Sequence, residues 1–454
     1  MDFLKPIPRR TFAADFNRAF PDVDMTAFRK FWIALIFSGL SLAAFAQDNH
    51  DAHTPDHSAQ AGETEHAAGS AAHEYACGHS LSIEPEFNAG DVAVHHISDA
   101  NAIHIVGDLY LHLPCILHAP GYGWTFTTTA AFDPHHHGNG TRSKDGYVLV
   151  HGNVMRLQNP AYASGEFEVS DYTHEEVTEE GKTKIRYHAI VNGQCEVLDA
   201  KTTYDGGLMG GGITSFNDFS ITRNVFTMLV TAILLFLLFW SVARASVRRS
   251  GQAPKGLQNF LEPFITFIRD EVAKPSIGPK YEKYVPYLLA IFFFILGLNL
   301  IGQIPFFPGS ANVTGNISVT IVLALITFII TTISGNKNYW EHIVWMPGVP
   351  AVLKIFIITP IEILGILLKP FTLLLRLFAN IAAGHIVVLS FVGLIFIFGD
   401  AGESVGGSIT GLIASIPLTL FMMALELLVA FLQAYIFTIL SATYFGMAVE
   451  EAHH

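Results

Sequence analysis

The sequence predicts an all-α polytopic membrane protein of about five to six membrane helices, the last two forming a long tilted hairpin, with an N-terminal extracytoplasmic β-rich domain. Several apolar runs are long enough to cross a bilayer, and a segment with strand-like alternation precedes the first of them. About half of the 454 residues (51%) are hydrophobic and the mean hydropathy is positive, which excludes a single soluble domain. The net charge of −13, without a basic patch, gives nucleic-acid binding no support.

Residues 1–46 have the layout of a secretory signal peptide. Arg29-Lys30 precede an apolar run over 31–45, and small residues flank the junction before Gln47. Because this run is short for a membrane span, we favour a cleaved signal over an anchor helix. Met25 lies where a signal of ordinary length would start, so residues 1–24 are expected to be untranslated or removed.

Residues 47–80 are expected to be a disordered, solvated tether. The segment is rich in His, Ala, Asp and Glu and shows no hydrophobic period. Its histidines are His50, His53, His57, His66, His73 and His79. Their spacing does not match a closed metal site, so no metal ligand and no cofactor are assigned, although weak zinc or copper binding stays an alternative.

A β-rich domain is predicted over residues 81–205. Leu109, Leu111 and Leu113 alternate with more polar residues, and Gly181 separates two stretches suited to a hairpin. A glycine-rich linker over 206–218 then leads to the membrane domain, 219–454.

Three cysteines precede the first predicted span, namely Cys77, Cys115 and Cys195. This location suits an oxidising compartment. An odd count leaves at least one thiol unpaired, and the sequence leaves every pairing open.

The first span is predicted over 221–242. Four basic residues follow it and only Arg223 lies at its other end, so the positive-inside rule places the N-terminal domain outside the cytoplasm. Residues 257–272 read as an amphipathic helix on the cytoplasmic membrane surface. Further apolar runs are 284–304, 317–334, a run from 353, 371–398 and 417–447, which leave the C-terminus in the cytoplasm.

Three polar groups interrupt the run 371–398. An arginine near the middle of such a helix costs roughly 2.5–3.5 kcal/mol on insertion scales, so Arg376 is expected to be functional. On an ideal helix Asn380 lies about 40° from Arg376, whereas His385 lies on nearly the opposite side. The three groups therefore serve two environments.

The last helix carries Glu426 and Gln433, seven residues apart and so close to one face. If the last two helices form an antiparallel hairpin, His385 and Glu426 meet in its outer half, whereas Arg376 and Gln433 lie nearer the middle. A histidine beside a glutamate fits a proton relay, and a purely structural hydrogen-bonded pair is the alternative. Glu362 lies about 21 Å before Arg376 if the helix is continuous, a continuity that Pro370 puts in question.

These residues and their neighbours resemble subunit a of F-type ATP synthases. The resemblance covers about 219–451 and rests on the motifs Arg376-Leu377-Phe378-Ala379-Asn380, Ala383-Gly384-His385, Leu432-Gln433-Ala434-Tyr435, Gly256-Leu257-Gln258-Asn259, Asn299-Leu300-Ile301-Gly302 and Asn316-Ile317-Ser318. The N-terminal part departs from the compact family pattern and looks like the enlarged region of some bacterial members.

The resemblance implies a stator subunit beside a ring of c subunits, with b-type peripheral stalk subunits as further partners, in a bacterial inner membrane. It gives Arg376 the role of the cation that faces the rotor carboxylate, with Asn380 and Gln433 as polar neighbours. It assigns His385 and Glu426 to the outer proton half-channel and Glu362 to the cytoplasmic one. Nucleotide chemistry is left to other subunits, since the chain has no phosphate-binding Gly-x-x-x-x-Gly-Lys-Ser/Thr loop.

Two other classes of function remain as alternatives. One is a self-contained ion-coupled secondary transporter, against which the lack of an inverted repeat counts. The other is a membrane-anchored protein whose histidine-rich segment binds metal. The choice between H⁺ and Na⁺ as coupling ion stays open, because it depends largely on the ring.

Overall fold

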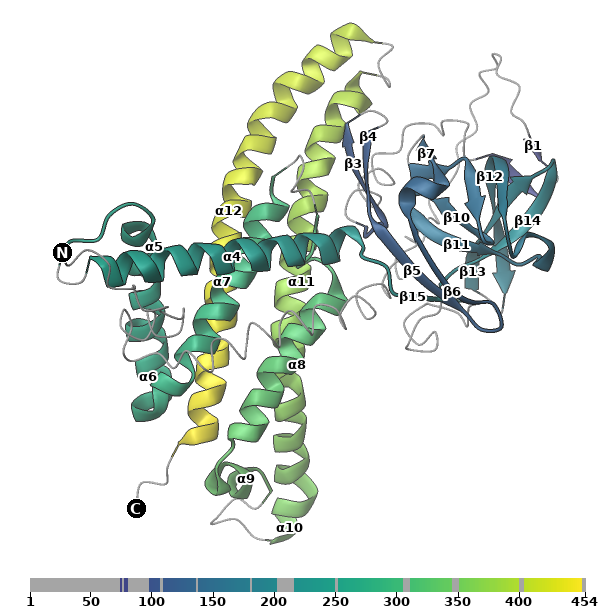
Figure 1. Cartoon of the computed structure of the whole chain (residues 1–454). Helices are drawn as coiled ribbons and strands as arrows, with labels where there is room; N and C mark the ends of the chain where they lie inside the picture. The colour runs from purple at the N-terminus through teal and green to yellow at the C-terminus, as the bar shows by residue number, and fades with distance from the viewer. Residues whose placement is uncertain are drawn as a thin grey trace, which may run out of the picture.

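The computed structural model describes residues 74–75, 77–80, 98–106, 109–135, 138–179, 182–201, 216–249, 252–304, 311–344, 351–399 and 404–450. They form a β-rich domain and a domain of long helices (Figure 1). The predicted signal region 1–46, and the histidine-rich segment up to residue 73, lie outside the described residues.

Six antiparallel strands of the β-rich domain close into a barrel. Each strand pairs with the next in the order β9 (Arg142–Lys144), β10 (Tyr147–Val150), β11 (Asn153–Leu157), β14 (Gln194–Asp199), β13 (Lys182–Val191) and β12 (Glu166–Glu179). The barrel closes because β12 also pairs with β9, with Phe167 opposite Ser143. Alternating buried residues of these strands fill the interior, among them Val148, Val150, Val169, Tyr172, Ala189 and Val191. The hairpin expected at Gly181 is confirmed, since Glu179 pairs with Lys182.

A smaller sheet packs against one side of this barrel. Its strands are β15 (Asn217–Asp218), β5 (Pro114–Ala119) and β6 (Gly123–Thr128). The inner face of β5 shares an apolar cluster with the barrel strand β10, composed of Cys115, Leu117, Ala119, Phe132, Tyr147, Leu149, Val154 and Phe216. The remaining elements are β3 (Ala102–Val106), β4 (Leu109–His112), β7 (Pro134–His135), β8 (Asn139–Gly140) and the 3₁₀ turns η1 (Thr129–Phe132) and η3 (Pro160–Tyr162).

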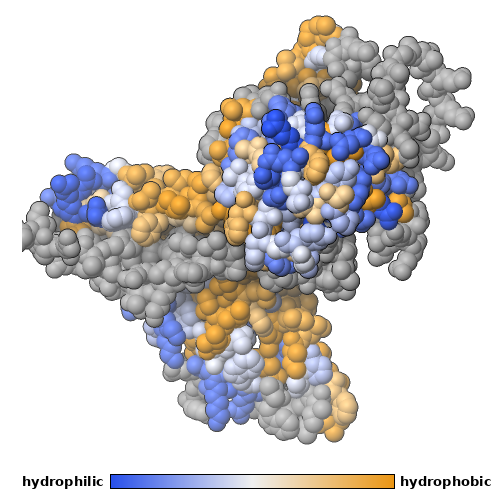
Figure 2. Space-filling model, turned by 45° about the vertical axis from the view of Figure 1, so that its right-hand side comes forward, coloured by the Kyte–Doolittle hydropathy of each residue, from blue (hydrophilic) through white to orange (hydrophobic). Residues whose placement is uncertain are grey.

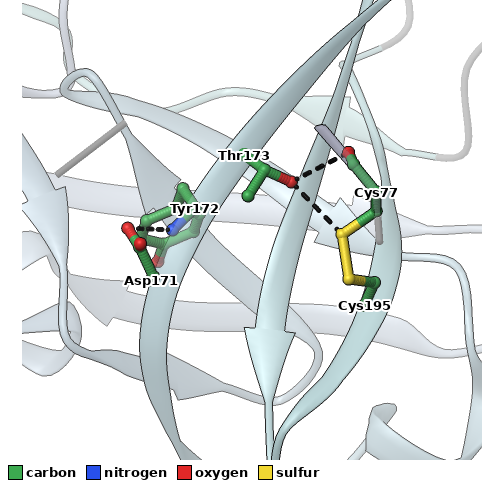
Figure 3. Close-up of a disulfide and its surroundings, with 5 residues drawn as sticks. All are labelled: Cys77, Asp171, Tyr172, Thr173 and Cys195. Carbon is green, nitrogen blue, oxygen red and sulfur yellow. Dashed lines mark hydrogen bonds between the residues drawn. A yellow bond between two sulfur atoms is a disulfide. The ribbon is translucent and has the colours of Figure 1, made fainter. Parts of the chain in front are cut away.

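A disulfide joins Cys77 to Cys195 and leaves Cys115 as a buried free thiol (Figure 3). Strands β1 (Glu74–Tyr75) and β2 (Gly78–Ser80) flank Cys77, and β2 pairs with β12. The Thr173 hydroxyl of β12 donates a hydrogen bond of 3.2 Å to the carbonyl oxygen of Cys77. The expected boundary of the tether at residue 80 is therefore wrong, because residues 74–75 and 77–80 are held by strand pairing and by the disulfide.

The expected linker 206–218 also ends too late. Phe216 is fully buried, and β15 pairs with β5, so residues 216–218 belong to the β-rich domain, while 206–215 lie outside the described residues. The chain then passes directly into the first long helix, α4 (Arg223–Arg248). The Asp99 carboxylate accepts a hydrogen bond of 3.0 Å from the backbone N–H of Asn224, where a negative group favours a helix N-terminus.

Five helices of the described chain are long and apolar enough to cross a membrane. They are α4, α7 (Val285–Gly302), α8 (Ile317–Ser334), α11 (Thr359–Phe398) with the preceding π-turn η6 (Lys354–Ile358), and α12 (Val405–Val449). The shorter elements between them are α5 (Leu257–Phe267), the π-turn η4 (Ile268–Ala273), α6 (Lys274–Ile277), η5 (Gly278–Lys283), α9 (Lys337–Val344) and α10 (Ala351–Leu353).

The last two helices are longer than the sequence predicts. The run from 353 and the run 371–398 form one continuous helix through Pro370, and α12 begins at Val405 instead of near 417. Helices of 40 and 45 residues are about 60 and 68 Å long, roughly twice the hydrocarbon thickness. They cannot stand along the membrane normal, and α4 crosses them at a steep angle (Figure 1).

On the face shown in Figure 2, the coloured surface of the helical domain is largely hydrophobic, whereas that of the β-rich domain is mainly polar. Ile333 on α8, Phe356 in the π-turn η6 and Phe421 on α12 are 81%, 76% and 62% exposed. Exposed apolar area of this extent marks contact with lipid or with other membrane subunits.

Candidate functional site

The candidate residues all lie in the antiparallel hairpin formed by α11 and α12. Glu362, Arg376, Asn380 and His385 belong to α11, and Glu426 and Gln433 belong to α12. Two glycines allow the helices to approach closely. A Cβ atom on Gly411 would lie 2.8 Å from the carbonyl oxygen of Leu394, and one on Gly384 would lie 3.2 Å from Glu426 Oε1. Small residues at such crossings are typical of membrane helices.

His385 and Glu426 meet across the hairpin. His385 Nδ1 lies 3.6 Å from Glu426 Oε1, and the two side chains are 18% and 6% exposed. The hairpin geometry predicted from helical spacing therefore holds for this pair. Their small separation, inside a largely apolar helix pair, allows a proton to pass between a carboxylate and an imidazole with little rearrangement.

A buried polar layer from α7 and the segment after it lies beside this pair. Asn299 Nδ2 donates to the carbonyl oxygen of Ala430, one turn after Glu426, at 3.3 Å, and Asn299 Oδ1 accepts from the Thr314 hydroxyl at 2.7 Å. A Cβ atom on Gly302 would lie 3.9 Å from His385 Nε2. Neither Asn299 nor Thr314 was predicted to belong to the site. Asn299 could have been predicted, because an amide within an apolar run needs a polar partner.

Arg376 and Asn380 lie on the opposite side of α11 and are exposed in this chain. Leu377, which follows Arg376 in the sequence but points to another side of the helix, is only 1% exposed and packs into the protein. Among the described residues, none of the ion pairs involves Arg376. A permanently charged guanidinium on an apolar membrane helix needs water or an oppositely charged group beside it.

Gln433 is separated from that face. Continuing the hairpin register from the Gly384–Glu426 contact places Gln433 at about the level of Arg376, as predicted. Its side chain, however, is buried at 4% exposure, between the buried residues Ala430 and Ala434. In this chain Gln433 therefore packs within the helical domain, whereas Arg376 and Asn380 point away from it.

Glu362, Lys369 and Arg376 follow one another at intervals of seven residues along the continuous helix α11. Each step of seven turns the helix by only about 20° and advances about 10 Å, so the three charges form one stripe. Lys369 Nζ lies 5.9 Å from the ring centre of Tyr339 and 5.4 Å from that of Tyr444.

A small cavity opens beside Lys369, between α8, α9, α11 and α12. Its lining includes Thr327, Thr331, Tyr339, Lys369 and Tyr444, but nearly all of its surface is apolar and its volume is about 10 Å³, so it is a packing void and not a water site. The sequence interpretation assigned no role to Lys369, although its seven-residue spacing from both Glu362 and Arg376 was visible.

Comparison with known proteins identifies the family. The family described as ATP synthase A chain matches residues 225–446. The ATP synthase subunit a of Pelodictyon phaeoclathratiforme is 35% identical over 350 residues, which cover 76% of this chain and 92% of that protein. The chain belongs to the ATP synthase subunit a family. It is thus a proton-translocating component of the membrane sector of the synthase, as distinct from a subunit that carries the nucleotide chemistry.

Other members of the family match about half of the chain. The ATP synthase subunit a of Chloroherpeton thalassium is 45% identical over 245 residues, 52% of this chain and 69% of that protein. The ATP synthase subunit a 2 of Chlorobaculum tepidum is 47% identical over 238 residues, 51% of this chain and 64% of that protein.

The β-rich domain also has relatives. Residues 92–191 match a family described as a domain of unknown function. The 350-residue match to the Pelodictyon protein is longer than the segment matched by the ATP synthase A chain family, so it extends into this domain. The Pelodictyon protein therefore shares part of this N-terminal extension.

Proposed function

We propose that this chain is the stator that offers two separate proton half-channels to a rotating ring of c subunits, each of which carries one membrane carboxylate. The observation that carries the proposal is the division of α11 into two polar environments. The exposed face with Arg376 and Asn380 makes no ion pair within the described chain, whereas His385 and Glu426 pair inside it. A ring carboxylate would supply the negative charge that the face with Arg376 lacks. A proton inlet would account for the buried pair of His385 and Glu426.

In the proposed mechanism, protons enter from the outer side through the pair Glu426 and His385. A ring carboxylate takes up a proton there and becomes neutral, so it can face lipid without the cost of a buried charge. After nearly a full rotation it meets Arg376, whose fixed positive charge favours the ionised carboxylate and so releases the proton.

Release continues toward the cytoplasm along the stripe of Lys369 and Glu362 on α11. Because a guanidinium stays protonated, Arg376 also prevents protons from passing directly between the half-channels. Asn380 and Gln433 supply hydrogen-bonding groups on either side of this barrier, Asn380 toward the ring and Gln433 within the helical domain.

We further propose a bacterial inner membrane location with the β-rich domain in the periplasm and the C-terminus in the cytoplasm. Basic residues at the C-terminal end of α4, including Arg244 and Arg248, support this orientation through the positive-inside rule. The disulfide between Cys77 and Cys195 supports an oxidising compartment for the β-rich domain. The ring of c subunits and b-type stalk subunits are the proposed partners.

The deciding experiment replaces Arg376 by Ala in the assembled synthase. ATP-driven proton pumping into inverted membrane vesicles should be abolished while the complex still assembles. The matched control is Thr372→Ala, one turn away on the same exposed side of α11, which should keep most of the pumping. If coupled pumping persists in Arg376→Ala, the proposal is wrong.

The metal-binding alternative has its own test. No cluster of three or more metal-ligating residues occurs among the described residues, but most of the histidine-rich segment lies outside them. Deleting 47–73, which spares β1, β2 and Cys77, should leave pumping unchanged. A loss of function confined to metal-poor medium would favour the metal hypothesis instead.

A further inference from the structure

Lys369 is a half-buried cation on the stripe of α11 that also carries Glu362 and Arg376. Its Nζ lies over two tyrosine rings, 5.9 Å from the ring centre of Tyr339 on α9 and 5.4 Å from that of Tyr444 on α12. Both distances are within the range over which the negative face of an aromatic ring attracts a cation. Lys369 forms none of the ion pairs in the described part of the chain, so two ring faces take the place of a carboxylate.

Hydrogen bonds hold the two rings in fixed positions relative to each other. The backbone N–H of Asn336, just before α9, donates to the carbonyl oxygen of Ala448, and Asn336 Nδ2 donates to that of Val449, each at 2.9 Å. Ala448 lies one turn after Tyr444 on α12, and Asn336 lies three residues before Tyr339. These bonds therefore fasten the start of α9 to the end of α12 and bring one ring from each helix to the ammonium.

The charges that flank Lys369 also lie close to this arrangement. Burial and the Glu362 carboxylate raise the pKa of the Tyr339 phenol above its ordinary value, which keeps this ring neutral. The charge of Arg376 acts on Tyr444, and that of Glu362 acts on Lys369. Each ring is thus near one of the two neighbouring charges.

Nothing in the lysine side chain itself keeps the ammonium away from Glu362. A lysine ammonium is mobile on its four-carbon stem, and helical side chains lean toward the helix N-terminus, which for Lys369 is the direction of Glu362. Without the rings, the ammonium would be free to pair with that carboxylate.

We propose that Tyr339 and Tyr444 are positioning residues that hold the Lys369 ammonium over the faces of their rings and so keep it from pairing with Glu362. The inference rests on the proposed cytoplasmic half-channel, in which Glu362 exchanges protons at the exit. An unpaired carboxylate can bind and release a proton there, whereas a carboxylate next to a cation binds protons about tenfold or more weakly.

The test replaces both rings by leucine in the assembled synthase. In the variant with Tyr339→Leu and Tyr444→Leu, the freed ammonium pairs with Glu362, and ATP-driven pumping into inverted vesicles should fall by about tenfold. The variant with Tyr339→Phe and Tyr444→Phe keeps both ring faces and removes only the hydroxyls, so it should pump nearly as fast as the unchanged synthase. If the phenylalanine variant loses as much as the leucine variant, the hydroxyls matter instead of the ring faces, and the proposal is wrong.

Lys369→Met distinguishes a role through the ammonium from simple packing. Once the ammonium is absent, replacing the rings by leucine should cause no further loss, so the triple variant should pump as fast as Lys369→Met alone. Tyr435→Leu is the matched control, because this tyrosine of α12 packs on Phe267, with ring centres 5.6 Å apart. Its effect should be the same with and without Lys369→Met. If the leucine pair also causes an equal loss in both backgrounds, the rings only pack the helices, and the proposal is wrong.

A second measurement does not depend on pumping. A zero-length carbodiimide joins an amine and a carboxylate that touch, forming an amide while the carbodiimide takes up the water. In the full chain reconstituted in phospholipid vesicles, coupling of Lys369 to Glu362 should rise several-fold in the leucine variant and stay unchanged in the phenylalanine variant. Mass spectrometry detects it as the loss of one water from the peptide that contains both residues. The pair Lys274 and Asp270, 2.7 Å apart, should couple equally in all variants and serves as the reference.

The coupling result is independent of the half-channels. If the leucine variant couples no more than the unchanged chain, the rings do not keep Lys369 from Glu362, and the proposal is wrong even where the half-channels are right. If coupling rises but pumping does not fall, the contact has no part in proton transfer, which also overturns the proposal. Failure of the half-channels themselves is read separately, from coupled pumping that persists in Arg376→Ala.

Discussion

Arg376 and His385 lie nine residues apart on one helix, yet their environments differ completely. His385 faces Glu426 inside the hairpin at 3.6 Å, whereas Arg376 is exposed and lacks an ion-pair partner among the described residues. Nine residues turn an α-helix by about 900°, which places the two side chains on opposite sides. One helix therefore places one polar group beside an ionisable partner within the chain and leaves the other exposed.

After Arg376, the largest effect is expected at the pair of His385 and Glu426. Glu426→Ala removes the carboxylate that His385 faces, so proton uptake from the outer side should slow by about 100-fold, the lower end of what a positioned proton-transfer group contributes. Proton flux through the membrane sector in vesicles measures this. Ser415→Ala, another buried polar residue of α12, is the control and should change the flux little. Equal proton flux in both variants would mean that the pair of His385 and Glu426 has only a structural role.

A second prediction tests the geometry of the pair without removing it. In Gly384→Val the new side chain would start 3.2 Å from Glu426 Oε1 and displace it. Overpacking of this kind costs about 1–3 kcal/mol, so the flux should fall by about tenfold. Gly365→Val makes the same change on the same helix where no atom lies within 4 Å, and it should have little effect. A similar loss in both would point to helix propensity as the cause.

Crosslinking tests whether the exposed face of α11 with Asn380 is the one that contacts the c subunits. In the assembled synthase, Asn380→Cys should crosslink to a c subunit with about fivefold higher yield than Gln433→Cys, since thiol reactivity follows exposure. The native cysteines add little background. Cys77 and Cys195 are bonded, and burial next to Asp218 raises the pKa of the Cys115 thiol to about 12. A higher yield from Gln433→Cys would mean that the hairpin rearranges on assembly.

The smallest effect is expected at Lys369. Lys369→Met removes the charge between Glu362 and Arg376 but keeps the apolar stem that lines the cavity. ATP-driven pumping should fall by about threefold, well below the loss expected at Glu426, because a flanking charge shifts rates by less than about 1.4 kcal/mol. The rate of acidification in vesicles gives the answer. If Lys369→Met abolished pumping, Lys369 would be as essential to the mechanism as Arg376.

Much of this arrangement follows from local sequence. Apolar runs fix the five long helices, and the turn per residue alone is enough to separate His385 from Arg376. The meeting of His385 and Glu426 also follows, because a short connection makes the last two helices antiparallel neighbours. These features depend on spacing within a helix, which the sequence states directly.

Other features depend on distant contacts and were not predictable. Proline normally interrupts a helix, but α11 runs through Pro370, as membrane helices can when their neighbours compensate for the lost hydrogen bond. Closure of the barrel depends on β9 pairing with β12, and the ends of the domain depend on Cys77 and on Phe216. Strand alternation alone contains no information about such partners.

The junction at Asp99 and Asn224 has a practical consequence. The β-rich domain caps α4 and accepts backbone hydrogen bonds from its first turn and the preceding residues at Ala100 and Pro114, so the start of α4 is attached to it by more than the connecting chain. In electron micrographs of the proposed assembly, the β-rich domain would appear as an off-axis knob beside the ring of c subunits. Such a knob breaks the pseudosymmetry of particle images and gives each rotational state an unambiguous reference direction.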